Sequence, residues 1–467
     1  MEVILEMLRR MTRVSRLGWL KGSLIALLSM LIGCSAAQTT PRTDTPTCPD
    51  HIGVFTSSAV STQFPTESGR ASEAIYYVSA EGNDRTGTPS DPATPYRSPR
   101  CAYSDIPADI TRGGGDHVIQ LMDGTVYGQL TMTPKVTDAA HRIILRAADG
   151  VTPTMDAYSR ADGSPGRAVS NPALRIQSNY VVVQGLRFNN TSQDPSVRDH
   201  EVMVRLDGSN VVIDGNYFDG NGRSPTTRDM FLLVCNTSSD NLISGNRFDF
   251  SGGKSLIHIT ASCGSGSPGR QVIRNNALSR FGNNPQLICA AINFGGLRGT
   301  FAGTDSVVEN NTIYDNGGGC YGLLDTNTSV LTVRNNIFSK ITGQRFAIGC
   351  GGIDGSSSGV AQDSVMFGNT NDVEPTCGLG GWTLSTYYAD NPYFVDPGAT
   401  PPDLHVESPT GSRRNRTSTW HIDTHCSVAV DKAPPSDAFD MEPSPNGGRR
   451  NLGAYGNTPE ASKSCGR

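Results

Sequence analysis

Charged residues are scarce in this sequence, at 18% of its 467 positions. After the N-terminal segment, no stretch shows the apolar periodicity of a helix, and Gly is unusually frequent with 52 residues. Helices are built mainly from Ala, Leu, Glu and Lys, whereas Gly and Asn favour tight turns. The composition therefore argues against a helical protein and favours many short strands joined by turns.

Basic charge is also in short supply. The chain has 39 Lys and Arg against 44 Asp and Glu, for a formal net charge of −5. Residues 1–33 hold five basic and two acidic residues, so the remainder carries −8. Binding to nucleic acid needs clustered Lys and Arg against the phosphates. We therefore expect no nucleic-acid partner.

The eleven Cys include no Cys-x-x-Cys pair, the spacing typical of metal sites. Six of them recur at intervals of 26 to 31 residues: Cys235, Cys263, Cys289, Cys320, Cys350 and Cys377. Stacked thiols or disulfides between neighbouring repeats are expected, as an oxidising compartment would allow. Cys48–Cys101 and Cys426–Cys465 are candidate pairs near the two ends of the chain. Spacing alone does not define the connectivity.

The N-terminus has the form of a targeting segment. Five basic residues precede an apolar stretch over 22–33 that is short for a membrane span. Leu31-Ile32-Gly33-Cys34 resembles a bacterial lipoprotein signal, which predicts lipidation of Cys34 and removal of residues 1–33. Simple cleavage after Ala37 is the alternative. Lipidation implies an anchor at the outer membrane or cell surface, and simple cleavage implies a periplasmic or secreted protein.

Composition divides the remaining chain into three parts. Residues 34–72 are rich in Thr, Ser, Pro and Ala, which predicts a flexible tether. We expect the folded domain over 73–390 and a closing, capping segment over 391–467. A short helix or irregular cap is expected over 98–112, because exposed sheet ends invite aggregation.

A repeat of about 30 residues dominates the central part. Its clearest copies read NVVIDGNYFDGNG, NLISGNRFDFSGG and QVIRNNALSRFG. Each has an aliphatic residue followed three positions later by Asn, and a large apolar residue two positions after that. The Asn column comprises Asn216, Asn246, Asn276, Asn311, Asn336 and Asn369.

The repeat length determines the architecture. A unit of 30 residues holds two or three strands but cannot bury a core alone, so units must stack. Stacked coils pair in parallel about 4.8 Å apart. Asn tolerates the left-handed turn, and its amide can bond to the Asn of the next coil. The sequence predicts an all-β, right-handed parallel β-helix, or solenoid, with an internal Asn ladder and caps at both ends.

The segments YYVSAEGNDRTGTPSDPATPYRS, NPYFVDP, DLHV and PNGGRRNLGAYGNTPEASKS add a resemblance over about residues 74–462. They resemble right-handed parallel β-helix proteins of the pectate lyase and chondroitinase-B-like superfamily. That resemblance implies a groove for an extended polysaccharide along one sheet face. It also implies the chemistry of a lyase, which needs a base and a cation beside the uronate carboxylate.

Ionisable residues of the strands upstream of each repeat are the candidates for this chemistry. From these strands we predict catalytic roles for Arg205, Lys254 and His258, and the resemblance adds Arg280 as a loose analogue of the Arg that such enzymes carry on a coil after their Lys. The three strand residues each have a plainer alternative. Arg205 can pair with Asp207 on the same strand face, and Lys254 can be a solvated turn residue. His258 can be a structural core residue, pointing inward if Cys235 and Cys263 form an outward column.

Calcium is the one cofactor considered, because Asp207 and Asp229 offer oxygen ligands. No dense Asp cluster and no close carboxylate pair of a glycoside hydrolase occurs. The sequence is therefore interpreted as an exported, monomeric, carbohydrate-active protein, foremost a pectate-type polysaccharide lyase acting on an acidic glycan. The alternative is a non-catalytic glycan-binding or adhesive surface protein.

Overall fold

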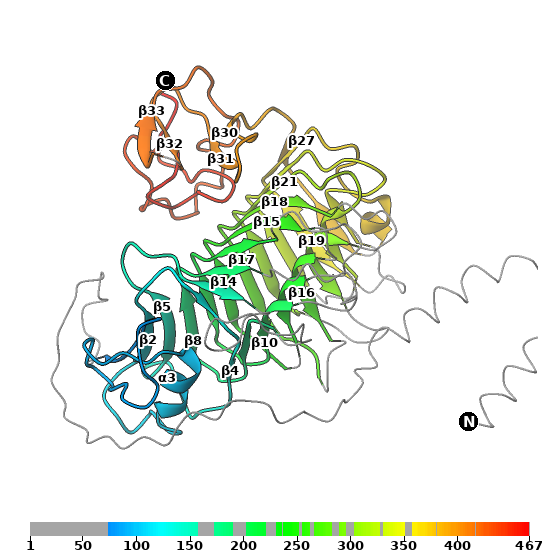
Figure 1. The fold of residues 1–467 in the computed structure, drawn as a ribbon. Helices are drawn as coiled ribbons and strands as arrows, with labels where there is room; N and C mark the ends of the chain where they lie inside the picture. The colour runs from blue at the N-terminus through cyan, green and yellow to red at the C-terminus, as the bar shows by residue number, and fades with distance from the viewer. Residues whose placement is uncertain are drawn as a thin grey trace, which may run out of the picture. The chain divides into compact units, whose positions relative to one another are not determined.

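The computed structural model describes residues 73–466 with gaps at 157–171, 190–201, 221–229, 236, 252–254, 262–265, 283–288, 296–302, 327–329, 351–356, 380 and 416. In these residues the chain forms a right-handed parallel β-helix, as predicted, whose stacked strands are visible in Figure 1. The predictions for 1–33, the tether, Cys34 and Cys48 lie outside the described residues. None of the described helices is long and apolar enough to cross a membrane.

The coils form three parallel sheets, and each complete coil contributes one strand to each of them. The eleven-stranded sheet contains β1 (Ala74–Val78), β2 (His117–Leu121), β5 (Ile143–Ala147), β8 (Val181–Gln184), β11 (Val212–Asp214), β14 (Asn241–Ser244), β17 (Gln271–Arg274), β20 (Ser306–Glu309), β23 (Leu331–Arg334), β26 (Gly359–Gln362) and β28 (Trp382–Leu384). These strands carry the aliphatic column of the repeat.

The ten-stranded sheet follows the Asn turn in each coil. It contains β3 (Val126–Tyr127), β6 (Thr154–Asp156), β9 (Arg187–Asn189), β12 (Tyr217–Asp219), β15 (Arg247–Ser251), β18 (Ala277–Phe281), β21 (Thr312–Tyr314), β24 (Ile337–Ser339), β27 (Ser364–Phe367) and β29 (Tyr387–Tyr388). The rings of Phe188, Phe218 and Phe248 stack inside this sheet at centroid distances of 4.9 and 4.4 Å.

The eight-stranded sheet completes each coil. It contains β4 (Leu130–Met132), β7 (Leu174–Ile176), β10 (Val202–Leu206), β13 (Met230–Val234), β16 (Ser255–Thr260), β19 (Ala290–Gly295), β22 (Tyr321–Asp325) and β25 (Ile348–Gly349). From β10 onward, these are the strands upstream of each repeat, which were predicted to form the groove.

A row of Asn side chains runs inside the turn between the first two sheets. Asn216 Nδ2 donates to Asn246 Oδ1 at 3.1 Å, and the same bond continues through Asn276, Asn311 and Asn336 at 3.0 to 3.1 Å. All five are buried. Their amides also bond to main-chain groups of the neighbouring coils, which satisfies polar groups that the turn removes from water.

The coil formed by β26 and β27 differs from the prediction. Val333 pairs with Ala361, so the ladder position after Asn336 is Ser364, whose Oγ accepts from Asn336 N at 3.2 Å. Asn369 lies five residues further on and accepts from Ile341 N instead. Met366 lies three residues before Asn369 and so fits the aliphatic position of the repeat by sequence, which is why the repeat pattern predicts Asn369 in the ladder.

Two short helices are found among the described residues. Helix α3 (Pro99–Asp105) lies within the region where a short cap was predicted, and Ser98 Oγ accepts from Cys101 N at its start. The 3-10 helix η1 (Pro375–Leu379) precedes β28. Three disulfides have both cysteines among the described residues: Cys289–Cys320, Cys350–Cys377 and Cys426–Cys465. The first two join neighbouring coils, as the Cys spacing predicted.

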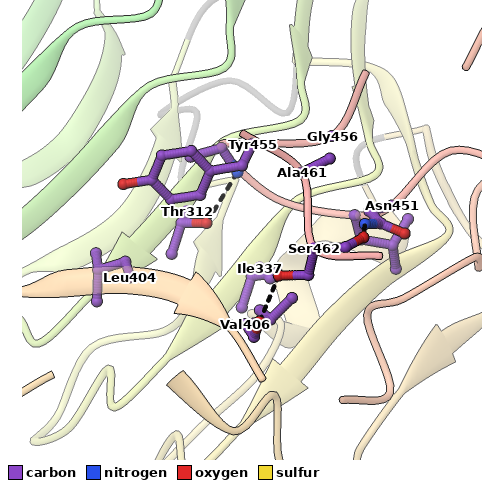
Figure 2. A pocket seen from close by; sticks show the side chains of 11 residues that line it. Thr312, Ile337, Leu404, Val406, Asn451, Tyr455, Gly456, Ala461 and Ser462 are labelled. Atoms are coloured by element: carbon purple, nitrogen blue, oxygen red, sulfur yellow. Dashed lines mark hydrogen bonds between the residues drawn. The ribbon is translucent and has the colours of Figure 1, made fainter. Parts of the chain in front are cut away.

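The C-terminal segment contains two antiparallel hairpins, β30 (Phe394–Asp396) with β31 (Asp403–Val406), and β32 (Ser412–Arg414) with β33 (Thr419–His421). Its core packs on the outer face of the ten-stranded sheet: Leu404 and Ala454 contact Ala277, and Val406 and Leu452 cluster with Ile337. Figure 2 shows this junction, where Ala454 N donates to Thr312 Oγ1 at 3.0 Å. We expected this segment to cover the end of the solenoid, but its described contacts run along one side.

A second row of Asn side chains bonds to the C-terminal segment. The residue before each ladder position has a positive φ: it is Gly at 185, 215 and 245, and Asn at 275, 310 and 335. Asn275 and Asn310 donate through Nδ2 to main-chain oxygens of the C-terminal segment, and Asn335 donates to Asp437 Oδ2 at 2.6 Å. In the later coils the turn residue is therefore Asn, which tolerates the left-handed conformation and whose amide also binds the segment.

Candidate functional site

The outward face of the eight-stranded sheet is the candidate site. Val204 and Leu206 are fully buried in the core, so Arg205 between them points outward. Strand pairing aligns Arg205 with Leu233, His258, Asn293 and Leu324 on successive coils. The sheet thus presents one continuous outer column with an Arg near its start and a His–Asn pair at its middle.

Two guanidinium groups meet one carboxylate at the start of this face. Arg175 Nε donates to Asp207 Oδ2 at 2.7 Å, and Arg205 Nε donates to Asp207 Oδ1 at 2.9 Å. The Asp207 side chain is 7% exposed, whereas those of Arg175 and Arg205 are 35% and 24% exposed. Both Arg residues use Nε, and their terminal nitrogens have no protein partner among the described residues. The three groups carry a net charge of +1, and the remaining donors match the geometry of a second carboxylate.

His258 points outward, because Ile257 and Ile259 on either side lie in the core. The inward orientation considered from the sequence is therefore wrong. The imidazole is nevertheless 5% exposed, and its Nδ1 lies 3.5 Å from Ser255 Oγ. Two strand spacings separate Arg205 from His258, about 10 Å. Both residues share a face, but they do not contact the same point.

Arg280 lies elsewhere. It belongs to β18 of the ten-stranded sheet, where its Nε donates to Asp249 Oδ1 at 2.8 Å and its Nη2 also bonds to this carboxylate. Asp249 is fully buried, and Arg280 Nη1 donates to Thr400 Oγ1 of the C-terminal segment at 3.2 Å. The structure therefore separates Arg280 from the proposed groove and gives it a role in holding that segment.

Lys254 and Asp229 lie outside the described residues, so their predicted roles remain predictions. Asp207, the other expected calcium ligand, has each carboxylate oxygen bonded to a guanidinium. Within the part of the chain that the structure describes, no group of three or more His, Cys, Asp or Glu could hold a metal ion. The described residues therefore do not fit a calcium site at Asp207.

Two site residues were missed from the sequence. Arg175 precedes the strands that were predicted to form the groove and lies in a strand of three residues, which is too short to be recognised from the sequence. Asn293 pairs directly with His258, is 4% exposed, and has a buried Oδ1 with no hydrogen-bond partner. Extending the repeat one coil backward and aligning the outer positions of each strand would have found both.

Comparison with known proteins gives likeness of fold only. No family model matches the sequence, and no curated protein sequence matches it significantly. Similar solved structures include a pectate lyase, at 16% identity over 83% of this chain and 97% of that one, with a TM-score of 0.43. An alginate lyase from Paenibacillus matches at 15% identity over 68% and 99%, with a TM-score of 0.36. A rhamnogalacturonan lyase matches at 10% over 73% and 93%, with a TM-score of 0.42.

Proposed function

We propose that the protein is an exported, surface-anchored carbohydrate-active protein that binds an acidic polysaccharide along the outward face of the eight-stranded sheet and cleaves it by β-elimination. The observation that supports this proposal is the Arg175–Asp207–Arg205 cluster. It offers unused guanidinium donors and a net positive charge on the outward sheet face of an otherwise acidic protein. A uronate carboxylate is the glycan group that such donors recognise.

The reaction needs a cation and a base. A base removes the proton on the carbon beside the uronate carboxylate. The electron pair of that bond forms a C=C bond, and the glycosidic oxygen leaves from the next carbon and takes up a proton. In the proposed arrangement, the terminal nitrogens of Arg175 and Arg205 bind the carboxylate and stabilise the negative charge that develops on it. His258 and Lys254 are the proposed bases.

A second candidate is a glycan-binding protein without catalysis. It is favoured by the separation of about two strand spacings between Arg205 and His258, roughly 10 Å. A carboxylate bound at Arg205 would belong to a different sugar unit from one beside His258. Binding at several points along the face would then hold the polymer without bringing a base to the bound uronate.

The two candidates differ in their product. The full-length protein is incubated with polygalacturonate, alginate and a neutral glucan, with calcium and with a chelator, and unsaturated uronate ends are followed by ultraviolet absorbance. We expect product from an acidic polymer, reduced at least about tenfold by Arg205→Ala through loss of carboxylate binding. Arg270→Ala is the matched control, because Arg270 pairs with Asp240 and is 54% exposed.

The outcomes separate the proposals. Binding of an acidic polymer without product, unaffected by Lys254→Ala, would contradict the lyase and support the binding protein. Equal binding of the neutral glucan would contradict both, since the guanidinium cluster would then have no role. Product that disappears with the chelator would indicate that calcium is required and that its ligands include residues other than Asp207.

A further inference from the structure

Asn293 and His258 form a neutral polar pair on the outward face of the eight-stranded sheet. They lie in register on the neighbouring strands β19 and β16 (Figure 1). The residues aligned with them on the next coils are Leu233 and Leu324, and both are buried. In the register of the described strands, the pair therefore lies between apolar side chains, with no charged residue aligned next to it.

The Asn293 side chain lacks a donor for its oxygen. It is 4% exposed, and Oδ1 accepts no hydrogen bond from any described residue. A buried acceptor without a donor is costly, so native proteins usually satisfy it with a protein group, a water or a ligand. Asn293 points outward, because Ile292 and Phe294 on either side lie in the core. The donor therefore has to come from the outward side of the sheet.

Gly295 leaves a space next to this acceptor. It follows Asn293 by two positions, so it shares the outward face, and it is partly exposed. A Cβ on Gly295 would lie 3.4 Å from Asn293 Oδ1, 3.6 Å from His258 Cε1 and 3.8 Å from His258 Nε2. Apart from the chain neighbours of the glycine, these are the atoms nearest to that point. The absent side chain thus leaves a notch between the Asn293 amide oxygen and the edge of the imidazole.

The polar atoms of the notch match a hydroxyl group. A hydroxyl has one proton to donate and lone pairs to accept, so it can donate to Asn293 Oδ1 and remain compatible with either tautomer of the imidazole. A carboxylate has no proton for Oδ1. An ammonium group would need a carboxylate partner, which the aligned residues Leu233 and Leu324 do not provide.

We propose that Asn293 is a specificity-determining residue of this face, whose Oδ1 accepts from one free hydroxyl of a sugar unit that lies in the notch beside His258. The inference rests on the proposed function and deepens it. Arg175 and Arg205 would bind the carboxylate of one unit, and the notch would recognise a hydroxyl of another, since His258 lies about 10 Å from Arg205. The preferred polymer is then an acidic glycan whose hydroxyl groups are not acylated.

The test compares polygalacturonate and alginate with the same polymers after chemical O-acetylation, which replaces the hydroxyl proton by a bulkier group. Binding to the full-length protein is measured by calorimetry, and unsaturated uronate ends are followed by ultraviolet absorbance. The wild-type protein should bind an unmodified acidic polymer more tightly than its acetylated form. Asn293→Ala should weaken binding of the unmodified polymer about fivefold, as expected for one neutral hydrogen bond, and should reduce the preference.

Gly295→Ala tests the notch without removing the amide. Its φ is outside the left-handed region and the added methyl group would meet its neighbours at ordinary contact distances, so this variant should fold. It should lose the preference for the unmodified polymer as Asn293→Ala does. Gly113→Ala is the matched control, because a Cβ there meets only Ile110 O, at 3.7 Å. Thermal midpoints show that each variant is folded.

The outcomes separate this inference from the proposed function. Arg205-dependent binding or product, with a preference that Asn293→Ala and Gly295→Ala leave unchanged, would overturn the notch and leave the proposed function standing. A lower thermal midpoint in Asn293→Ala without a change in preference would show that Oδ1 holds only an ordered water. Failure of every acidic polymer to bind would overturn both. A preference that both variants lose and Gly113→Ala keeps would support the notch, whether or not the polymer is cleaved.

Discussion

Glu442 is the buried carboxyl group whose protonation should have the clearest effect on stability. It is 6% exposed, and its Oε1 accepts from Asn451 N and Asn457 N at 2.8 and 2.7 Å, while Oε2 has no partner. Burial raises its pKa to about 7. The native C-terminal segment therefore binds this proton more tightly than the unfolded chain does.

The expected consequence is a loss of stability at alkaline pH. A raised pKa contributes stability that is fully present below the unfolded value of 4.5 and is lost as pH rises through about 7. A pKa shift of this size contributes at most about 3 kcal/mol to the free energy of unfolding. Denaturant titrations between pH 5 and 8.5 should show the decline, and Glu442→Gln should remove it. The exposed Glu81→Gln is the control, and an unchanged decline in Glu442→Gln would contradict the assignment.

The Asn ladder gives a second prediction at the residue scale. The Asn246 side chain makes four bonds: it accepts from Asn216 N and Nδ2, and it donates to Ile213 O and Asn276 Oδ1. Asn246→Ala would leave these buried groups unpaired and should lower the free energy of unfolding by at least about 3 kcal/mol. Asn446→Ala, which removes one bond to Gly448 N at 3.3 Å, should have little effect.

The end of the ladder provides a test of opposite sign. Ser364 takes the ladder position in the coil of β26 and β27 and accepts only from Asn336 N, leaving Asn336 Nδ2 without a ladder partner. Ser364→Asn should extend the row by one bond and stabilise the protein by about 1 kcal/mol. A destabilised variant would show that this coil cannot accommodate a ladder residue.

At the scale of elements, the sequence predicts the scaffold better than the site. The aliphatic, Asn and Phe columns recur at a fixed interval, so they define which residues face inward and which coils are neighbours. The outward column has no such regularity: Arg205, Leu233, His258 and Asn293 differ on every coil. Their orientation also depends on a strand bend, since Met203 and Val204 both lie in the core. Periodicity therefore could not show that His258 faces outward.

Ion pairs between strands of different coils could not be predicted from the sequence either. Asp207 lies 32 residues from Arg175, and the identity of its second partner follows only once β7 and β10 are placed side by side. The Arg280–Asp249 pair likewise required the register of β15 and β18. Where the coil length changes, as before Asn369, a register error follows because the sequence offers no other reference.

Docking of the C-terminal segment gives a prediction at this scale. Asn310 donates to Asn451 O and Gly453 O at 3.0 and 3.3 Å and accepts from Arg450 Nη1 at 3.0 Å. Asn310→Gly keeps the left-handed turn and deletes these bonds, so hydrogen exchange within 391–467 should increase while β10 to β22 stay protected. Gly215→Asn is the control, since a Cβ there meets nothing within 4 Å. Equal exchange in both variants would exclude a docking role.

At the scale of the whole molecule, the disulfides agree with export. Cys289–Cys320, Cys350–Cys377 and Cys426–Cys465 bridge coils or chain segments that are 27 to 39 residues apart. Such bridges persist in oxidising compartments and are rare in the cytosol. They are compatible with the N-terminal targeting segment inferred from the sequence.

Anchoring by lipid is the remaining proposal at this scale. If Cys34 carries the lipid, the native protein should partition into detergent on phase separation, and Cys34→Ser should move it to the aqueous phase. Mass spectrometry of the mature N-terminus identifies the modified residue. A mature chain that begins at Gln38 would contradict lipidation and indicate simple cleavage after Ala37.

The change from Gly to Asn at the left-handed turn position distinguishes the later coils from the earlier ones. Stacked repeats are nearly interchangeable, so nothing in the core tells a docking segment which coil it has reached. Gly185, Gly215 and Gly245 offer the segment no side chain at this position in the early coils. Asn275, Asn310 and Asn335 offer it an amide in three successive later coils. We therefore expect these three Asn side chains to specify which coils the C-terminal segment binds. A chain with one early coil added or deleted would lengthen or shorten the uncovered sheet and leave the C-terminal segment bound to the same three coils.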